Sequence, residues 1–168
     1  MDRSTRHSRV LEATKEIFAP ITGGSGGAYT ALGGHTGYLI SGDTQYAYAE
    51  LFIPWDFTGI DPLKEARVTF IAQATLNPMS FRVVTNWCKT ERAYFDHNQL
   101  INYNVNTVLN RLQGQSIAEA LVGLGDNAPL EAGDYLGVQI SRVAGQNTNA
   151  IFLGARIRYN TPIYAHAP

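Results

Sequence analysis

A β-strand is predicted by the residues Tyr46-Ala-Tyr-Ala-Glu-Leu-Phe-Ile53, which are followed by Pro54. It is rich in aromatic and apolar residues, and Pro54 ends it because proline donates no hydrogen bond to a strand ladder. Outwards from this stretch, the sequence predicts further short strands over residues 67–74, 80–87, 101–106, 135–141 and 151–159. In the last of them, one face is predicted to carry Ile151, Leu153, Ala155, Ile157 and Tyr159, and the other Arg156 and Arg158.

Turn-forming residues separate the strands. Leu76-Asn-Pro-Met79 predicts a turn that makes residues 67–74 and 80–87 a hairpin. Gly145–Asn149 is the predicted hairpin loop between the last two strands. Helix signals are weak: Ser116–Val122 predicts one or two turns, with Glu119 at the capping-box distance from Ser116. The sequence therefore predicts an all-β chain.

About seven or eight short strands without alternating helices favour two antiparallel sheets packed face to face, a β-sandwich. Immunoglobulin-like and jelly-roll topologies both fit that number of strands. We expect three parts. Residues 1–37 form an N-terminal arm, residues 38–160 form the sandwich, and residues 161–168 form a C-terminal tail.

The expected arm has a polar, basic start and a glycine-rich connector. A first strand is predicted over residues 15–22, at a sheet edge because of Pro20, with a short helix inside residues 4–18 as the alternative. Seven glycines within residues 23–37 predict a flexible connector, since glycine loses much backbone entropy on ordering.

Composition excludes several classes of protein. The 168 residues carry a net charge of −1, so the chain lacks the basic field of a nucleic-acid-binding protein. The single cysteine, Cys88, excludes an internal disulfide framework and a cysteine-built zinc site. No apolar run is long enough to span a membrane, and no classical secretory signal follows Met1.

No catalytic, cofactor-binding or metal-binding residue is predicted. Gly24-Ser25-Gly26 is followed by no helix, so it is not a nucleophile elbow. The four histidines lack metal-ligand spacing; His97 is interpreted as a polar loop residue and Cys88 as a half-buried structural thiol.

Two weaker patterns are typical of sugar-binding sandwiches. Exposed aromatic rings can stack on sugar rings, and clustered carboxylates can bind calcium. Core packing is favoured for the aromatic candidates, which are Trp55, Trp87, Tyr94 and Tyr103. No calcium-loop signature supports the carboxylate candidates, which are Asp43, Asp56, Asp61, Asp126 and Asp134.

Three arginines form the predicted interaction site. Arg156 and Arg158 share a face of the last strand, and Arg142 ends the strand before it. Their strands carry no matching acidic alternation. A solvated face is one interpretation; pairing with carboxylates of another chain is the functional one, because arginine is favoured at interfaces.

Three segments carry a resemblance to a known family. Residues 46–57 resemble a strand ending in a Pro-x-Asp-Phe turn, residues 130–142 a turn followed by a strand, and residues 153–159 a closing strand. Together they are similar to the single-jelly-roll virion proteins of tailed phages and related viruses, which decorate capsids or build fibres. The resemblance covers residues 38–160 and implies a homotrimer without an active site.

We therefore expect a structural protein of the virion, assembled in the host cytoplasm. The leading expectation is a capsid decoration or cement subunit that stabilises a shell by binding the assembled lattice of a major capsid or other virion protein. The alternative is a carbohydrate-binding β-sandwich module, for example a receptor-binding fibre or tail domain, with a glycan as partner. A sandwich-fold enzyme such as a cupin is disfavoured because closely spaced histidine ligands are missing.

Overall fold

A computed structural model describes residues 11–60, 66–75, 78–93, 97–121, 129–143, 145 and 149–163, with Leu11 and Glu12 described by their backbone alone. These residues form strands, their connections and one short 3-10 helix, η1 (Ala118–Ala120). The described part of the chain contains no helix that is long and apolar enough to cross a membrane.

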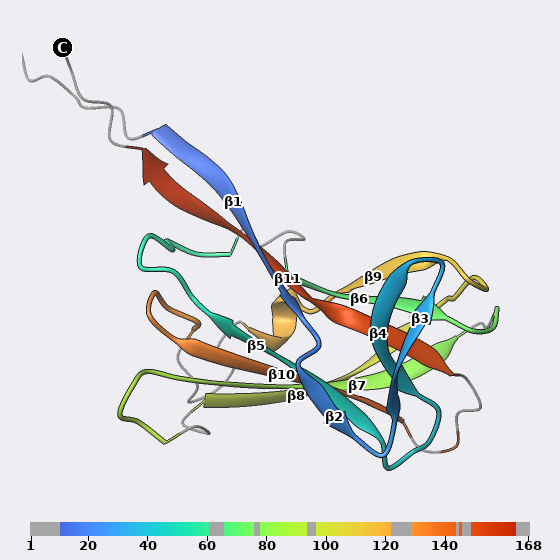
Figure 1. The fold of residues 1–168 in the computed structure, drawn as a ribbon. Helices are drawn as coiled ribbons and strands as arrows, with labels where there is room; N and C mark the ends of the chain where they lie inside the picture. Colours follow the sequence, from blue (N-terminus) through green and yellow to red (C-terminus); the bar gives the residue numbers. More distant parts are fainter. Residues whose placement is uncertain are drawn as a thin grey trace, which may run out of the picture.

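The strands form two antiparallel sheets that lie in two layers (Figure 1). Sheet A has the order β3 (Ala28–Leu32), β4 (His35–Ile40), β11 (Ala150–Ile163), β6 (Ala66–Ala72) and β9 (Leu112–Ser116), and β1 (Leu11–Pro20) also pairs with β11. Sheet B has the order β2 (Gly23–Ser25), β5 (Tyr46–Phe52), β10 (Tyr135–Arg142), β7 (Met79–Cys88) and β8 (His97–Val105). The predicted all-β sandwich is confirmed.

The eight strands from β4 to β11 have jelly-roll topology. One sheet contains β4-β11-β6-β9 and the other β5-β10-β7-β8, and the chain crosses between the sheets at every connection except β7 to β8. This order decides between the two topologies that the sequence left open, in favour of the jelly roll.

Both predicted hairpins are wrong for the same reason. Strand β6 belongs to sheet A and β7 to sheet B, so the turn near Met79 crosses the sandwich. Strands β10 and β11 also lie in different sheets: β10 pairs with β5 and β7, whereas β11 pairs with β1, β4 and β6. A short connection fits a hairpin and a crossover equally well, so the local sequence did not separate them.

The prediction of a flexible glycine-rich connector over residues 23–37 is also wrong, because these residues form strands. Strand β2 pairs with β5, β3 pairs with β4, and β4 pairs with β11. The expected boundary between the arm and the sandwich, at residues 37 and 38, therefore falls inside β4. The glycines permit close packing: a Cβ atom at Gly24 would lie 2.5 Å from the ring of Tyr38. The predicted strand over residues 15–22 corresponds to β1, and it lies at an edge as expected.

A β-bulge in β11 changes which residues face the core. The register with β6 shifts between Phe152 and Gly154. Ile151 and Leu153 therefore pack in a small cluster with Ile71, whereas Ala155, Ile157 and Tyr159 belong to the main core. The single face predicted for these five β11 residues is wrong at this point. The helix predicted over residues 116–122 is likewise reduced to η1 within the described residues.

Large aromatic side chains join the two layers. Phe70 and Phe152 from sheet A contact Phe81 from sheet B, with ring centroids 5.6 and 5.7 Å apart. Trp87 of β7 is fully buried, at 0% exposure. Burial of large apolar side chains is the main stabilising contribution in a sandwich of this size.

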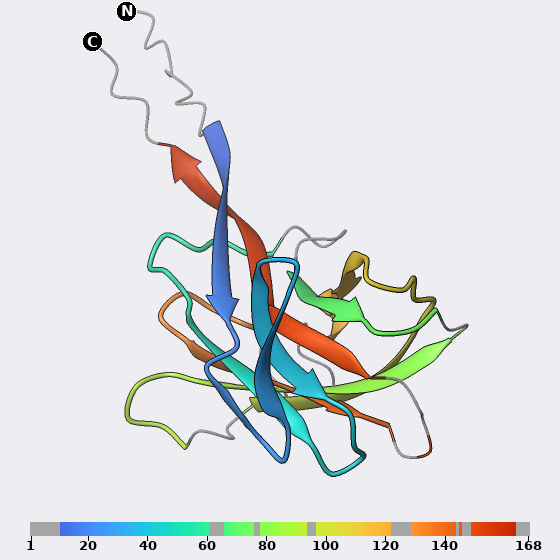
Figure 2. The same cartoon turned by 45° about the vertical axis from the view of Figure 1, so that its right-hand side comes forward.

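Strand β1 and the second half of β11 form a two-stranded ribbon that projects beyond the sandwich (Figure 2). The pairing runs without interruption from Leu11 opposite Ile163 to Pro20 opposite Gly154. At its inner end the two strands are very close: a Cβ atom on Gly154 would overlap the carbonyl oxygen of Ala19 and lie 2.7 Å from the ring of Phe18.

We expect Gly154→Ala to destabilise the protein by about 1–3 kcal/mol, the usual cost of overpacking, because the new methyl group pushes β1 away from β11. Urea denaturation measures the effect. Gly114→Ala on β9 is the matched control, since the nearest atom to its new Cβ, Cδ of Arg67, is 3.5 Å away. Equal stability of the two variants would contradict the close contact.

Candidate functional site

The outer face of sheet B carries an unusual set of side chains. Along β5, the small or aliphatic residues Ala47, Ala49 and Leu51 face the core and are buried. The alternate positions, Tyr48, Glu50 and Phe52, are exposed on the outer face. The period of two thus divides β5 into a core face and an aromatic, polar outer face.

Three exposed aromatic rings meet at one end of this face. Phe52 is the central one: its ring centroid lies 5.2 Å from that of Tyr135 and 5.7 Å from that of Trp55. Tyr135 is brought beside Phe52 by the β5–β10 register. Trp55 is 78% exposed and Tyr135 is 52% exposed, although both are large apolar groups. Such a contiguous exposed apolar group marks a binding site more often than isolated exposed residues do.

The position of Trp55 depends on a glycine turn. Gly133 has φ +82°, which glycine adopts without strain, and a Cβ atom there would lie 2.7 Å from Cη2 of the Trp55 ring. The indole thus rests on the bare backbone of Gly133. The turn is joined to the end of β5, because the Gly133 amide donates to the Ile53 carbonyl at 2.9 Å and the Ile53 amide donates to the Asp134 carbonyl at 2.8 Å.

A hollow adjoins the aromatic rings. It has a volume of about 460 Å³ and is lined by Glu50, Leu51, Phe52, Asn86, Cys88, Tyr135, Leu136 and Gly137. Gly137 lies opposite both Glu50 and Asn86 in the register, so its missing side chain leaves the space between them open. The hollow therefore combines aromatic surface with a carboxylate and an amide, which is the mixture of apolar and polar groups typical of small-molecule sites.

An ion pair lies near the aromatic end of the face. Nζ of Lys89 and Oε2 of Glu131 are 2.6 Å apart, and both side chains are about half exposed. The hydrogen bond from Lys89 lowers the pKa of Glu131 below its ordinary value, and the same bond raises the pKa of Lys89. Exposed pairs of this kind contribute little to stability.

The turn that carries Trp55 is also connected to the ribbon through its next residue, Asp56. The Asp56 carboxylate accepts hydrogen bonds from Lys15 of β1 and, on β11, from the Tyr159 hydroxyl at 3.2 Å and the Thr161 hydroxyl at 3.0 Å. The hydrogen bond from Lys15 is the main cause that lowers the pKa of Asp56. Burial is the main cause that raises the pKa of Tyr159. One turn therefore presents Trp55 to the candidate site and Asp56 to the ribbon.

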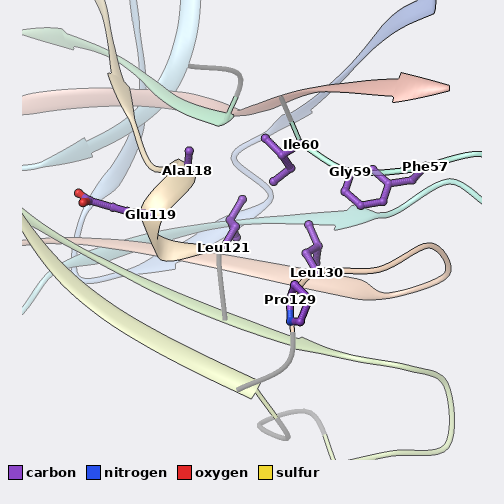
Figure 3. A pocket seen from close by; sticks show the side chains of 8 residues that line it. All are labelled: Phe57, Gly59, Ile60, Ala118, Glu119, Leu121, Pro129 and Leu130. Carbon is purple, nitrogen blue, oxygen red and sulfur yellow. The ribbon is translucent and has the colours of Figure 1, made fainter. Parts of the chain in front are cut away.

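A second cavity opens between the two sheets (Figure 3). It has a volume of about 350 Å³, and Ile60, Leu121 and Leu130 point towards one another across it. Glu119 is its one charged lining residue among the described residues, and its side chain points away from the other labelled side chains (Figure 3). An apolar cavity without convergent polar groups offers little to orient a ligand, so the outer face of sheet B is the better candidate site.

The four aromatic residues that were candidates for stacking on sugar rings do not lie in one place in the structure. Trp55 lies in the exposed aromatic group, whereas Trp87 and Tyr103 belong to the core, and Tyr94 lies outside the described residues. Phe52 and Tyr135, the partners of Trp55, were missed. Their signal was present: in 46–53 the outward aromatic residues alternate with small alanines, and Tyr135 follows the Gly133 turn.

The carboxylate candidates do not converge. Asp43 accepts hydrogen bonds from Arg142 and from the Gly145 amide, Asp56 faces the ribbon, and the Asp134 side chain accepts from the Glu131 amide at 2.7 Å. Asp61 and Asp126 lie outside the described residues. No group of three or more histidine, cysteine, aspartate or glutamate residues suited to a metal ion occurs in the described ranges. His97 stacks on Trp87, with ring centroids 5.7 Å apart.

The three predicted interface arginines do not share one sheet face. Arg142 ends β10 in sheet B, whereas Arg156 and Arg158 lie on β11 in sheet A. Acidic partners also exist within the chain: Arg142 lies 2.6 Å from Asp43, and Glu16 of β1 lies 3.6 Å from Arg156 and 3.2 Å from Arg158. The prediction missed these partners because they come from distant segments, and the interface itself stays a prediction.

Comparison with known proteins gives no family for the chain. No protein-family model and no curated protein sequence matches it. Among solved structures, the chain is similar to a carbohydrate-binding module of family CBM36 in complex with calcium and xylotriose. The TM-score is 0.46 with 9% identity, over 86% of this chain and 98% of the module.

Parts of two larger proteins are also similar to this chain. A family two carbohydrate esterase from Cellvibrio japonicus matches with TM-score 0.47 and 8% identity over 94% of this chain, which spans 37% of the esterase. The enzymatically active domain of tailspike protein 4 from bacteriophage CBA120 matches with TM-score 0.36 and 13% identity over 90% of this chain and 19% of the tailspike chain.

We expect Asp56 to make stability depend on acid pH. Its pKa is lower in the folded state than in the unfolded chain, so the ionised carboxylate stabilises the fold above the unfolded value of about 3.9. That stabilisation is lost as the pH falls through the folded-state pKa. Thermal unfolding between about pH 5 and pH 2 should therefore show a smaller acid-induced fall in Tm for Asp56→Asn than for the parent protein.

Lys15→Met serves as the second variant in that experiment. It removes the main cause of the lowered pKa without removing the carboxylate, so its acid-induced fall in Tm should also be smaller than in the parent. An unchanged pH profile in both variants would show that Asp56 contributes nothing to the attachment of the ribbon.

Proposed function

We propose that this domain binds carbohydrate on the outer face of sheet B, as a non-catalytic binding module. The observation that carries the proposal is the exposed group formed by Phe52, Trp55 and Tyr135, which borders the hollow over Gly137. Glycan binding is the alternative function that the sequence predicted.

The chemistry of the face suits a sugar. The apolar side of a sugar ring packs on an aromatic ring, and its hydroxyl groups need hydrogen-bonding partners at the edge of that contact. Trp55 rests on Gly133 and remains largely exposed, so it is already held in place before a ligand arrives. Glu50 and Asn86 line the adjoining hollow and supply a carboxylate and an amide for the hydroxyls.

A glycan array followed by titration calorimetry tests the proposal. We expect Trp55→Ala to weaken binding of the best array ligand by about tenfold or more, which corresponds to about 1.4 kcal/mol, with little change in Tm. The matched control is Tyr29→Ala on β3, because Tyr29 is an exposed aromatic residue of sheet A. Absence of binding to every array glycan, or equal losses in the two variants, would contradict the proposal.

We propose assembly into a virion as a second candidate function, with this chain as a homotrimeric decoration, fibre or tail subunit. One surface feature supports an interface between copies. Val108, Leu109 and Leu112 are exposed apolar side chains close together in sequence, at the start of edge strand β9 and in the connection before it. An edge strand with exposed apolar neighbours is a favourable place for association.

Light scattering of the purified protein tests the second candidate. We expect a trimer mass for the parent and a smaller mass for Leu109→Asp, because a buried unpaired charge opposes association. Arg158→Glu tests the separate prediction that the arginines form the interface. A monomer mass for the parent protein would contradict assembly through either surface.

A further inference from the structure

A second aromatic platform lies on the same face of sheet B as the group around Phe52. It is the ring of Tyr48, which leans over the edge strand β2: a Cβ atom at Gly23 would lie 2.5 Å from Cζ of Tyr48. Gly23 is the register partner of Tyr48. Because Gly23 has no side chain, the phenol ring can cover its backbone, and Tyr48 as a residue remains 38% exposed.

The two platforms are spaced along one strand. Tyr48 and Phe52 are four residues apart on β5 and point to the same side, which places their Cα atoms about 13 Å apart at 3.3–3.4 Å per residue. Glu50 lies between them on the same side, beside the hollow over Gly137. Across from Tyr48, the β10 residue in register is Gln139. Aromatic and hydrogen-bonding groups therefore alternate along the direction of β5.

The aromatic rings do not lie in one plane. The plane of Phe52 makes angles of 67° with that of Trp55 and 58° with that of Tyr135. A flat crystalline surface would contact only one such ring at a time. A single chain whose successive units rotate about their linkages can follow rings at different angles, so the geometry favours an individual glycan chain over a packed crystal face.

The charge on the face selects against acidic sugars. At the outward positions of the described strands of sheet B, the charged residues are Glu50 and Arg82. The Lys89–Glu131 pair near the aromatic end adds one charge of each sign, and Glu50 is the charged residue that lines the hollow. Arg82 is engaged with Asn102, to whose Oδ1 its Nε donates at 3.2 Å. A uronate or sialate carboxylate near Glu50 would meet a like charge, whereas a neutral sugar hydroxyl would donate to it.

We infer that this face binds an individual, uncharged oligosaccharide chain lying along β5, with the group around Trp55 at one end and Tyr48 at the other. The inference rests on the proposed glycan-binding function and extends it, because it assigns the mode of binding, the charge class of the ligand and the role of Tyr48. Tyr48 is a specificity residue for chain length, and Glu50 is a specificity residue for charge.

Titration calorimetry with neutral glucan, mannan, galactan and xylan oligosaccharides of two to six sugar units tests the chain-length role. For the series that binds, we expect the parent affinity to rise with length until both platforms are covered. Tyr48→Ala should lose about tenfold in affinity for the longest ligand and little for the shortest. Trp55→Ala should lose affinity at every length.

Gly23→Ala tests whether binding needs the Tyr48 ring in its present position, because this variant keeps the ring but moves it. The new methyl group displaces the ring, whose far end can move, so the variant should reproduce the length-dependent loss while its urea midpoint stays near that of the parent. An affinity that does not change with length, or an equal loss at all lengths in Tyr48→Ala, would overturn the inference. No binding of any oligosaccharide by the parent would instead contradict the proposed function itself.

Paired ligands test the role of Glu50. We compare a neutral oligosaccharide with the corresponding chain that carries a uronate, and expect the parent to prefer the neutral one by about tenfold. Glu50→Gln keeps the size of the side chain and removes the charge, so it should reduce the preference. A parent that prefers the acidic ligand would overturn the charge assignment, while the length dependence is judged separately.

Discussion

Strand β11 holds sheet A together through backbone hydrogen bonds to three other strands. Its first residues pair with β4 on one side and β6 on the other, and from Gly154 onwards β1 takes the place of β4. Strands β1, β4 and β6 all bond to β11 directly, and β3 and β9 join the sheet through β4 and β6. The bulge at Leu153 changes the register of β11 with β6, and Gly154, which has no side chain, lets β1 approach β11 closely just after the bulge.

The candidate site arises from the same rule that builds the core. In β5, Ala47, Ala49 and Leu51 face inward and belong to the same main core as Phe70, Phe81 and Phe152. The alternate β5 residues point outward and do not pack in the core. Aromatic and polar side chains can therefore occupy those positions without disturbing the sandwich. The glycines at 23, 133 and 137 complete the face: two give rings a flat backbone to rest on, and one leaves a hollow. Rigid strands carry most of the site, which suits a function that depends on ring positions.

Local sequence patterns predicted the individual strands, but they did not predict which distant strands pair with one another. The alternation in 46–53, 135–141 and 151–159 correctly predicted strands, and Pro20 correctly predicted an edge. The paths of the chain after Ala72 and after Arg142 were wrong, because a short connection does not show whether the next strand joins the same sheet or the opposite one. The glycine-rich strands were missed because their glycines pack closely against the rings of Tyr38 and Tyr48, and glycine content alone does not show that close approach. Trp55 was recognised as an aromatic candidate, but its partners became visible only when the register placed Tyr135 beside Phe52.

The ribbon made by β1 and β11 has a mechanical consequence. Leu11 and Ile163 lie opposite each other at its far end, so a force that separates these two residues acts across the strands and breaks their hydrogen bonds in succession. A ladder loaded in this way yields at low force, whereas the same ladder loaded along its strands would need to lose many bonds at once. Tension applied there would therefore peel β1 away as far as Asp56, where Lys15, Tyr159 and Thr161 meet one carboxylate, before it reached the sandwich.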